Sequence, residues 1–125
     1  MPALVAACPS FEGPWRESLA DFPKAEGRGV YIDLGEFATH LVDLLERDET
    51  AEFPVVFASV ERLFHDGDAG IRHALKFGLI EDIGNVAAHR QGGWAFAARF
   101  RLWLGPAATE AWDALHEMWG TSDPG

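Results

Sequence analysis

The chain has 125 residues, of which 20 are acidic and 10 basic, and its formal net charge is −10 with histidine neutral. The length suits one domain, and the 48% of hydrophobic residues supply enough apolar material for one core. The negative charge argues against a main role in binding nucleic acid or an anionic membrane, because phosphate groups would repel it.

Other protein classes are excluded by residues that the sequence lacks. A single cysteine, Cys8, cannot form an internal disulfide framework or a cysteine-rich zinc site. The apolar start of the chain is too short for a secretory signal and has no positively charged region, and no apolar run approaches the roughly 18 residues of a membrane span. We therefore expect a cytoplasmic protein with one domain over residues 1–125.

The N-terminal part predicts one helix after a loosely ordered lead-in at residues 1–13, from which Phe11 can pack against the body. A proline in the first turn suits the helix that follows, because its missing N–H leaves no hydrogen bond unmade there. Apolar residues then recur at helical spacing, at Trp15, Leu19 and Phe22. Residues 30–32 predict a short extended approach to the next helix.

The clearest helix is predicted at residues 34–47. Asp33 followed by Glu36 has the spacing of a capping box. One face is apolar at helical spacing, at Leu34, Phe37, Ala38, Leu41, Leu44 and Leu45. A third helix is predicted at about 51–64, with Thr50 as its cap and Pro54 in its first turn, where proline is tolerated.

The second half of the chain predicts two longer helices around an ambiguous aromatic segment. Asp68 can cap a helix that continues to about residue 88, with an apolar face at Ile71, Leu75, Leu79, Ile83 and Val86. Gly78 inside this helix can allow the close approach of a neighbour or permit a bend. Residues 94–104 predict a short helix or an irregular segment. A last helix is predicted at about 107–119, with Ala111, Trp112, Leu115, Met118 and Trp119 on its inner face, before a frayed tail at 121–125.

Five helical segments with short links and no strand-like alternation indicate an all-α protein. Successive antiparallel hairpins fit a compact bundle or a small repeat-like stack of about five helices.

Metal and catalytic chemistry have little support in the sequence. Two Glu–His pairs share a helical spacing of four, at Glu36/His40 and Glu61/His65, but the Glu-x-x-His spacing of di-iron bundles is absent. The serines lack the glycine context of a nucleophile elbow, and no glycine pair has the strand-to-helix context of a phosphate loop. We therefore expect no metal, no cofactor and no enzymatic activity.

Charge is distributed unevenly along the chain. Residues 33–82 carry 12 acidic and 4 basic side chains, whereas residues 83–105 carry three arginines and no acid. One interpretation is an acidic face that binds a basic protein partner, with a small basic island elsewhere; the other is a solvated surface that keeps the protein soluble. The densest acidic stretch supplies the candidate partner-binding residues Asp43, Glu46, Asp48, Glu49 and Glu52.

The aromatic C-terminal part offers a second interpretation. Six large aromatic residues fall in the last 32 positions, at Trp94, Phe96, Phe100, Trp103, Trp112 and Trp119. Most are expected in the core. The alternative function is a small ligand-binding or enzymatic bundle with a pocket near these tryptophans, and Arg99 and Arg101 among them make the segment a second candidate interface.

Three stretches together carry a family resemblance: YIDLGEFATHLVDLL (Tyr31–Leu45), VERLFHDGDAGIRHALKFGLIEDIGN (Val60–Asn85) and LGPAATEAWDALHEMWG (Leu104–Gly120). The chain resembles a family of small, acidic, helical bacterial proteins of which members are seen among suspected toxin-immunity proteins. The resemblance implies a protein-binding module, such as an immunity protein that neutralises a cationic toxin, and no catalytic set. Its motif positions here are Glu61, Glu81, Asp82, Asn85, Gly105, Pro106, Trp112 and Trp119, with structural roles expected first.

Overall fold

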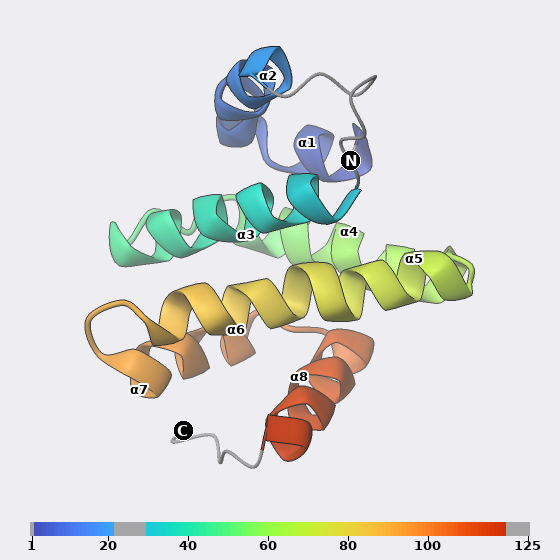
Figure 1. Ribbon diagram of the computed structural model, residues 1–125, viewed down its shortest axis with the longest axis vertical. Coiled ribbons are helices and arrows are strands. Elements are labelled where there is room, and N and C mark those ends of the chain that lie inside the picture. The colour runs from blue at the N-terminus through green and yellow to red at the C-terminus, as the bar shows by residue number, and fades with distance from the viewer. Residues whose placement is uncertain (1, 22–29, 120–125) are drawn as a thin grey trace.

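A computed structural model describes residues 2–21 and 30–119, and these residues form helices and no strand (Figure 1). The elements are α1 (Pro2–Ala7), the 3₁₀-helix η1 (Pro9–Phe11), α2 (Glu12–Asp21), α3 (Val30–Glu46), α4 (Phe53–Asp66), α5 (Ala69–Ala74), the π-helix η3 (Leu75–Ile80), α6 (Glu81–Ala88), α7 (Gly93–Ala97), the 3₁₀-helix η4 (Ala98–Leu102) and α8 (Pro106–Trp119). The prediction of an all-α fold is confirmed.

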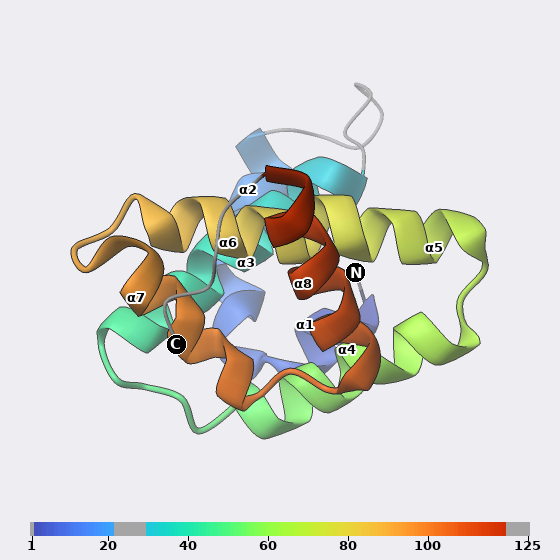
Figure 2. The ribbon, with the colours of Figure 1, turned by 90° about the horizontal axis from the view of Figure 1, so that it is seen from below.

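The helix α3 lies at the centre of the arrangement. Its predicted apolar face is buried as expected, and it packs against η3 and α6. In Figure 1, α3 runs side by side with the continuous α5–η3–α6 segment, while α4 returns behind it. Figure 2, seen from below, shows α8 crossing this long segment at a steep angle, and α8 also contacts α4.

The long segment begins as the sequence predicts. The side chain of Asp68 accepts a hydrogen bond from the backbone N–H of Ile71 at 2.9 Å, which caps α5. Farther along, a Cβ atom on Gly78 would lie 3.0 Å from Leu34 Cδ1 and 3.1 Å from Tyr31 Cδ1. Gly78 therefore permits the close approach of α3, at the point where the segment widens into a π-helix.

The stretches Val60–Asn85 and Leu104–Gly120, which carry part of the family resemblance, contact each other where α4 packs against α8. The carboxylate of Glu61 on α4 accepts hydrogen bonds from the backbone N–H groups of Ala107, at 2.6 Å, and Ala108, at 3.2 Å. These amides belong to the first turn of α8 and have no partner within the helix, so Glu61 serves as its N-terminal cap. A Cβ atom on Gly105 would lie 2.6 Å from Glu61 Oε2, so glycine leaves room for the cap.

The prediction of a loosely ordered lead-in at residues 1–13 is wrong for its described part. Residues from Pro2 onward form α1, η1 and the start of α2, and Leu4, Cys8 and Phe11 are buried. Cys8 lies between α1 and η1 in a non-helical conformation, and all three side chains pack in the core. Only the packing of Phe11 was expected.

Four local predictions also differ from the structure. Residues 30–32 are helical, so Asp33 is buried inside the first turn of α3 and does not occupy the N-cap position. The cap position of α4 is Glu52, whose side chain does not bond to the backbone of that helix, and the carbonyl of Thr50 accepts a hydrogen bond from the N–H of Phe53. Two predicted core residues are exposed, namely Ile71 and Met118. The side chains of Leu19 and Trp119, the residue Phe22 and the tail at 121–125 lie outside the described part.

Candidate functional site

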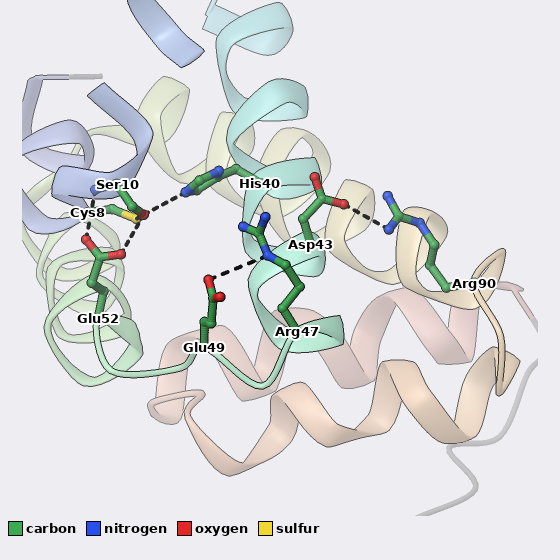
Figure 3. Close-up of polar contacts among 8 residues, drawn as sticks. All are labelled: Cys8, Ser10, His40, Asp43, Arg47, Glu49, Glu52 and Arg90. Atoms are coloured by element: carbon green, nitrogen blue, oxygen red, sulfur yellow. Dashed lines mark hydrogen bonds and ion pairs between the residues drawn. The ribbon is translucent and has the colours of Figure 1, made fainter. Parts of the chain in front are cut away.

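The five predicted partner-binding carboxylates lie near the end of α3 and in the loop that leads to α4. Figure 3 shows Asp43, Glu49 and Glu52 among them. We call them the acidic ridge: Asp43, Glu46, Asp48, Glu49 and Glu52. All five are exposed or partly exposed, and the side chain of Asp48 is 88% exposed.

The chain turns within the ridge through a Schellman motif. Asp48 has a φ of 59°, in the left-handed region that Asp tolerates better than most residues. Its N–H donates to the carbonyl of Leu45 at 3.0 Å, and the N–H of Glu49 donates to the carbonyl of Leu44 at 2.8 Å. This turn ends α3 and projects the Asp48 and Glu49 side chains from the loop.

Three arginines of the chain reach the ridge. Arg90 Nη1 donates to Asp43 Oδ1 at 2.9 Å and to Glu46 Oε1 at 2.5 Å. The hydrogen bond that Arg90 donates to Asp43 raises the pKa of Arg90, and the bond to Glu46 raises it further, whereas burial lowers it. Arg90 comes from the turn after α6, so the pair fastens the ends of α3 and α6 together.

The other two arginine contacts are longer. Arg47 Nε lies 3.5 Å from Glu49 Oε2, and Arg99 Nη2 lies 3.9 Å from Asp48 Oδ1. The prediction of a basic island apart from the acidic face is therefore wrong for Arg90 and Arg99. The ridge is an acidic surface whose charge is partly compensated from within the chain.

Glu52, the fifth carboxylate, belongs to a polar network around Ser10 (Figure 3). It accepts the Ser10 hydroxyl at 2.5 Å and the Ser10 backbone N–H at 3.0 Å. Burial alone would raise the pKa of Glu52, but these hydrogen bonds outweigh it and the pKa is lowered. The ring Nε2 of His40 lies 2.8 Å from the Ser10 oxygen, and Cys8 Sγ lies 3.6 Å from it.

The direction of these hydrogen bonds limits the chemistry of the network. Because the ionised Glu52 takes the only proton of the Ser10 hydroxyl, His40 must donate its own Nε2–H to Ser10. A serine activated as a nucleophile would instead donate to the histidine. Burial also lowers the pKa of His40 and raises the pKa of the Cys8 thiol. The arrangement therefore joins η1 to α3 and α4 and has the wrong polarity for a catalytic triad.

A groove of about 850 Å³ extends from the ridge along α3, beneath α2. Asp43 and Glu49 line one end, with Ser10 and His40 beside them, and Tyr31 lines the other end. The groove is open, its lining mixes polar and apolar side chains, and it gives the ridge a concave side.

The other features considered in the sequence were a metal site, a pocket near the aromatic segment and a membrane span. Over residues 2–21 and 30–119, no group of three or more His, Cys, Asp or Glu side chains has a geometry that could hold a metal ion. The aromatic segment is mostly core: Phe100 is buried, and Phe53 lies 5.8 Å from its ring centroid and 4.9 Å from that of Trp103. Within the described part, no helix combines the length and the apolar character of a membrane span.

Sequence reasoning found the carboxylates but missed their partners. Ser10 was placed in a loosely ordered lead-in, His40 was considered only as a metal ligand, and Arg90 was assigned to a separate surface. One signal was present: Leu4, Cys8 and Phe11 have helical spacing, which would have packed Ser10 against the body.

Comparison with known proteins identifies the family. The family model described as a domain of unknown function, DUF7674, matches residues 1–120. The chain belongs to the DUF7674 family. No curated protein and no solved structure matches it. The DUF7674 match includes all three stretches that carry the sequence resemblance, together with the residues of the acidic ridge and of the Ser10 network.

Proposed function

We propose that this DUF7674 protein is a non-enzymatic protein-binding module of the cytoplasm that engages a basic partner through the acidic ridge. The observation that carries the proposal is the gathering of five carboxylates at the end of α3 and in the loop that leads to α4. Such a surface attracts cations and repels nucleic acid and anionic lipids.

The internal arginines support this role. Arg90 holds Asp43 and Glu46 in fixed positions, so a partner need not order these two side chains on binding. Asp48 and Glu49 make only longer ionic contacts and remain exposed to solvent. Opposite charge on a partner would accelerate association by roughly tenfold or more at low salt. Exposed ion pairs contribute only about 0–1 kcal/mol each, so close packing around them must supply the rest of the affinity.

The partner that fits this chemistry is a cationic toxin, which the protein would neutralise as an immunity factor. A toxin that acts on nucleic acid must itself present positive charge to phosphates. An acidic ridge bound over that surface would compete with the substrate. The resemblance to suspected immunity proteins supports the same conclusion.

The alternative, a ligand-binding or enzymatic bundle near the C-terminal tryptophans, has less support. Trp103 packs on Phe53 and Trp112 is buried in the core. The Ser10 hydroxyl is committed to Glu52, which argues against nucleophilic catalysis there. No contact among the described residues favours a ligand-binding or enzymatic site near these tryptophans.

The experiment is capture of a partner from lysate of the source cells with the full chain, followed by calorimetry with the purified partner. A ridge variant (Glu46→Gln, Asp48→Asn, Glu49→Gln) is compared with a control that loses the same charge from α4 and α8 (Asp66→Asn, Glu110→Gln, Glu117→Gln). We expect a basic partner whose affinity falls roughly tenfold for the ridge variant and much less for the control. An acidic partner, or equal losses in both variants, contradicts the proposal.

A further inference from the structure

A second hollow, of about 660 Å³, lies where α1, α3, α4 and α5 meet, away from the acidic ridge. The four helices can be followed in Figure 1. Its buried lining includes Leu4 of α1, Leu34 of α3 and Leu75 of η3. We call it the aliphatic groove. Its volume is in the range of small-molecule sites, which are lined mainly by apolar side chains with few polar groups.

Two apolar stripes end in exposed residues at this groove. Ile71 precedes Leu75 by one helical turn and was predicted in the core, yet it remains 42% exposed. Val30 precedes Leu34 by one turn of α3 and is 44% exposed. Both residues line the groove. Exposed aliphatic side chains gathered around a concavity, unlike scattered ones, are typical of binding sites.

Among the described residues that line the groove, Asp68 is the one that is ionisable. Its Oδ1 atom accepts the N–H of Ile71 as the cap of α5, and the side chain is exposed. The nearby Arg72 donates to the carbonyl of Gly67 and lines a different hollow. The groove therefore presents an aliphatic surface and a carboxylate, which complement an apolar chain with a positively charged end.

We propose that the aliphatic groove binds a small alkylammonium-type molecule, with its chain against Leu4, Leu34 and Leu75 and its amine at Asp68. The site goes beyond the proposed protein-binding function and does not depend on it. A fully apolar molecule would gain no ionic contact with the carboxylate, and a fatty acid would bring a second negative charge to it.

The test uses the full chain, labelled at methyl groups, and titration with octylamine, octanol and octanoate at neutral pH below their micellar concentrations. We expect octylamine to shift the methyl resonances of Leu4, Leu34 and Leu75 and to bind roughly two- to fivefold more tightly than octanoate. Asp68→Asn keeps a capping side chain while removing the charge, so the preference should disappear in a protein that remains folded. Asp66→Asn is the matched control and should retain the preference.

A second variant tests the position of the chain. Ala3 lines the groove and is exposed, so Ala3→Phe adds volume at the rim without disturbing the core, and it should weaken binding of octylamine and octanol alike. The proposal is overturned if octylamine shifts other methyl groups, or if its preference over octanoate survives Asp68→Asn. It is also overturned if the methyl resonances of Leu4, Leu34 and Leu75 respond to protein concentration and not to added octylamine. That result would mean that a second copy of the chain, and not a small molecule, covers the groove.

Discussion

The cap that Glu61 provides to α8 makes a quantitative prediction about two residues far apart in the sequence. Glu61→Ala removes the acceptor for the N–H groups of Ala107 and Ala108. Gly105→Ala should disturb the same cap, because its new Cβ atom would lie 2.6 Å from Glu61 Oε2. Backbone strain plays no part, since Gly105 is not among the glycines with positive φ.

The magnitude follows from the contacts. Loss of an N-cap costs about 0.5–2 kcal/mol, and loss of the charge at the helix N-terminus adds about 0.3–1 kcal/mol. We therefore expect Glu61→Ala to lower the free energy of unfolding by about 2 kcal/mol. Gly105→Ala should cost about 1–2 kcal/mol, because the Glu61 side chain can move aside only by giving up its hydrogen bonds.

The assay is denaturant unfolding of the wild type, both single variants and the double variant. Once Glu61→Ala has removed the carboxylate, Gly105→Ala has nothing to displace, so its cost should fall to about zero and the coupling energy should be about 1–2 kcal/mol. Glu110→Ala, at an exposed position of α8, is the control and should change stability by less than about 0.5 kcal/mol. If Gly105→Ala costs as much in the Glu61→Ala background as in the wild type, the cap is refuted.

Three further predictions concern stability. Burial, with a contribution from Glu81, raises the pKa of the Asp82 carboxyl group. The folded state therefore binds the carboxyl proton more tightly than the unfolded state, and the free energy of unfolding should fall as pH rises from about 4 toward 7. Asp82→Asn should make this fall smaller in denaturant unfolding measured across the same pH range. At the left-handed Asp48, Asp48→Val should lower the free energy of unfolding by about 1–2 kcal/mol, whereas Asp48→Asn should change it by less than about 0.5 kcal/mol; equal effects would contradict the turn geometry. Leu41→Ala should cost about 2–5 kcal/mol because Leu41 is fully buried, and the exposed Met118→Ala should cost little; a cost below about 1 kcal/mol at Leu41 would mean that its face is misplaced.

The parts of the fold that the sequence predicted are those with strong local signals. The face containing Leu34 and Leu41 repeats at helical spacing, and Asp68 is followed by a long apolar stripe, so both features were read correctly. The aromatic segment at 94–104 fits no single period, and it forms a short α-helix followed by a 3₁₀-helix. The prediction of one domain over the whole chain stays a prediction.

The errors lie where tertiary contacts override local signals. Residues 30–32 looked extended because of their β-branched and aromatic character, but Tyr31 packs beside Gly78 and α3 continues through it. Residues 1–13 were predicted to be loosely ordered, whereas Pro2 and Pro9 begin the short helices α1 and η1, where proline is well accommodated.

The candidate site was predictable only where its residues are close together in the sequence. The carboxylates from Asp43 to Glu52 are dense within a short stretch, which a single sequence displays directly. Their partners are not close in sequence: Arg90 lies 47 residues from Asp43, and Ser10 lies 42 residues from Glu52. Such pairs depend on helix packing, for which the sequence has no local signal.

The central claim, that the acidic ridge steers a basic partner, is tested most directly by the association rate constant of the captured partner across a salt series. The account predicts that the rate for the wild type falls steeply as salt rises. It also predicts that the variant Glu46→Gln, Asp48→Asn, Glu49→Gln associates roughly tenfold more slowly at low salt and approaches the wild type once the Debye length is about 3 Å, near 1 M. The control with Asp66, Glu110 and Glu117 neutralised should stay close to the wild type. A wild-type rate that is insensitive to salt, or a ridge variant that associates as fast as the wild type at low salt, would contradict the account.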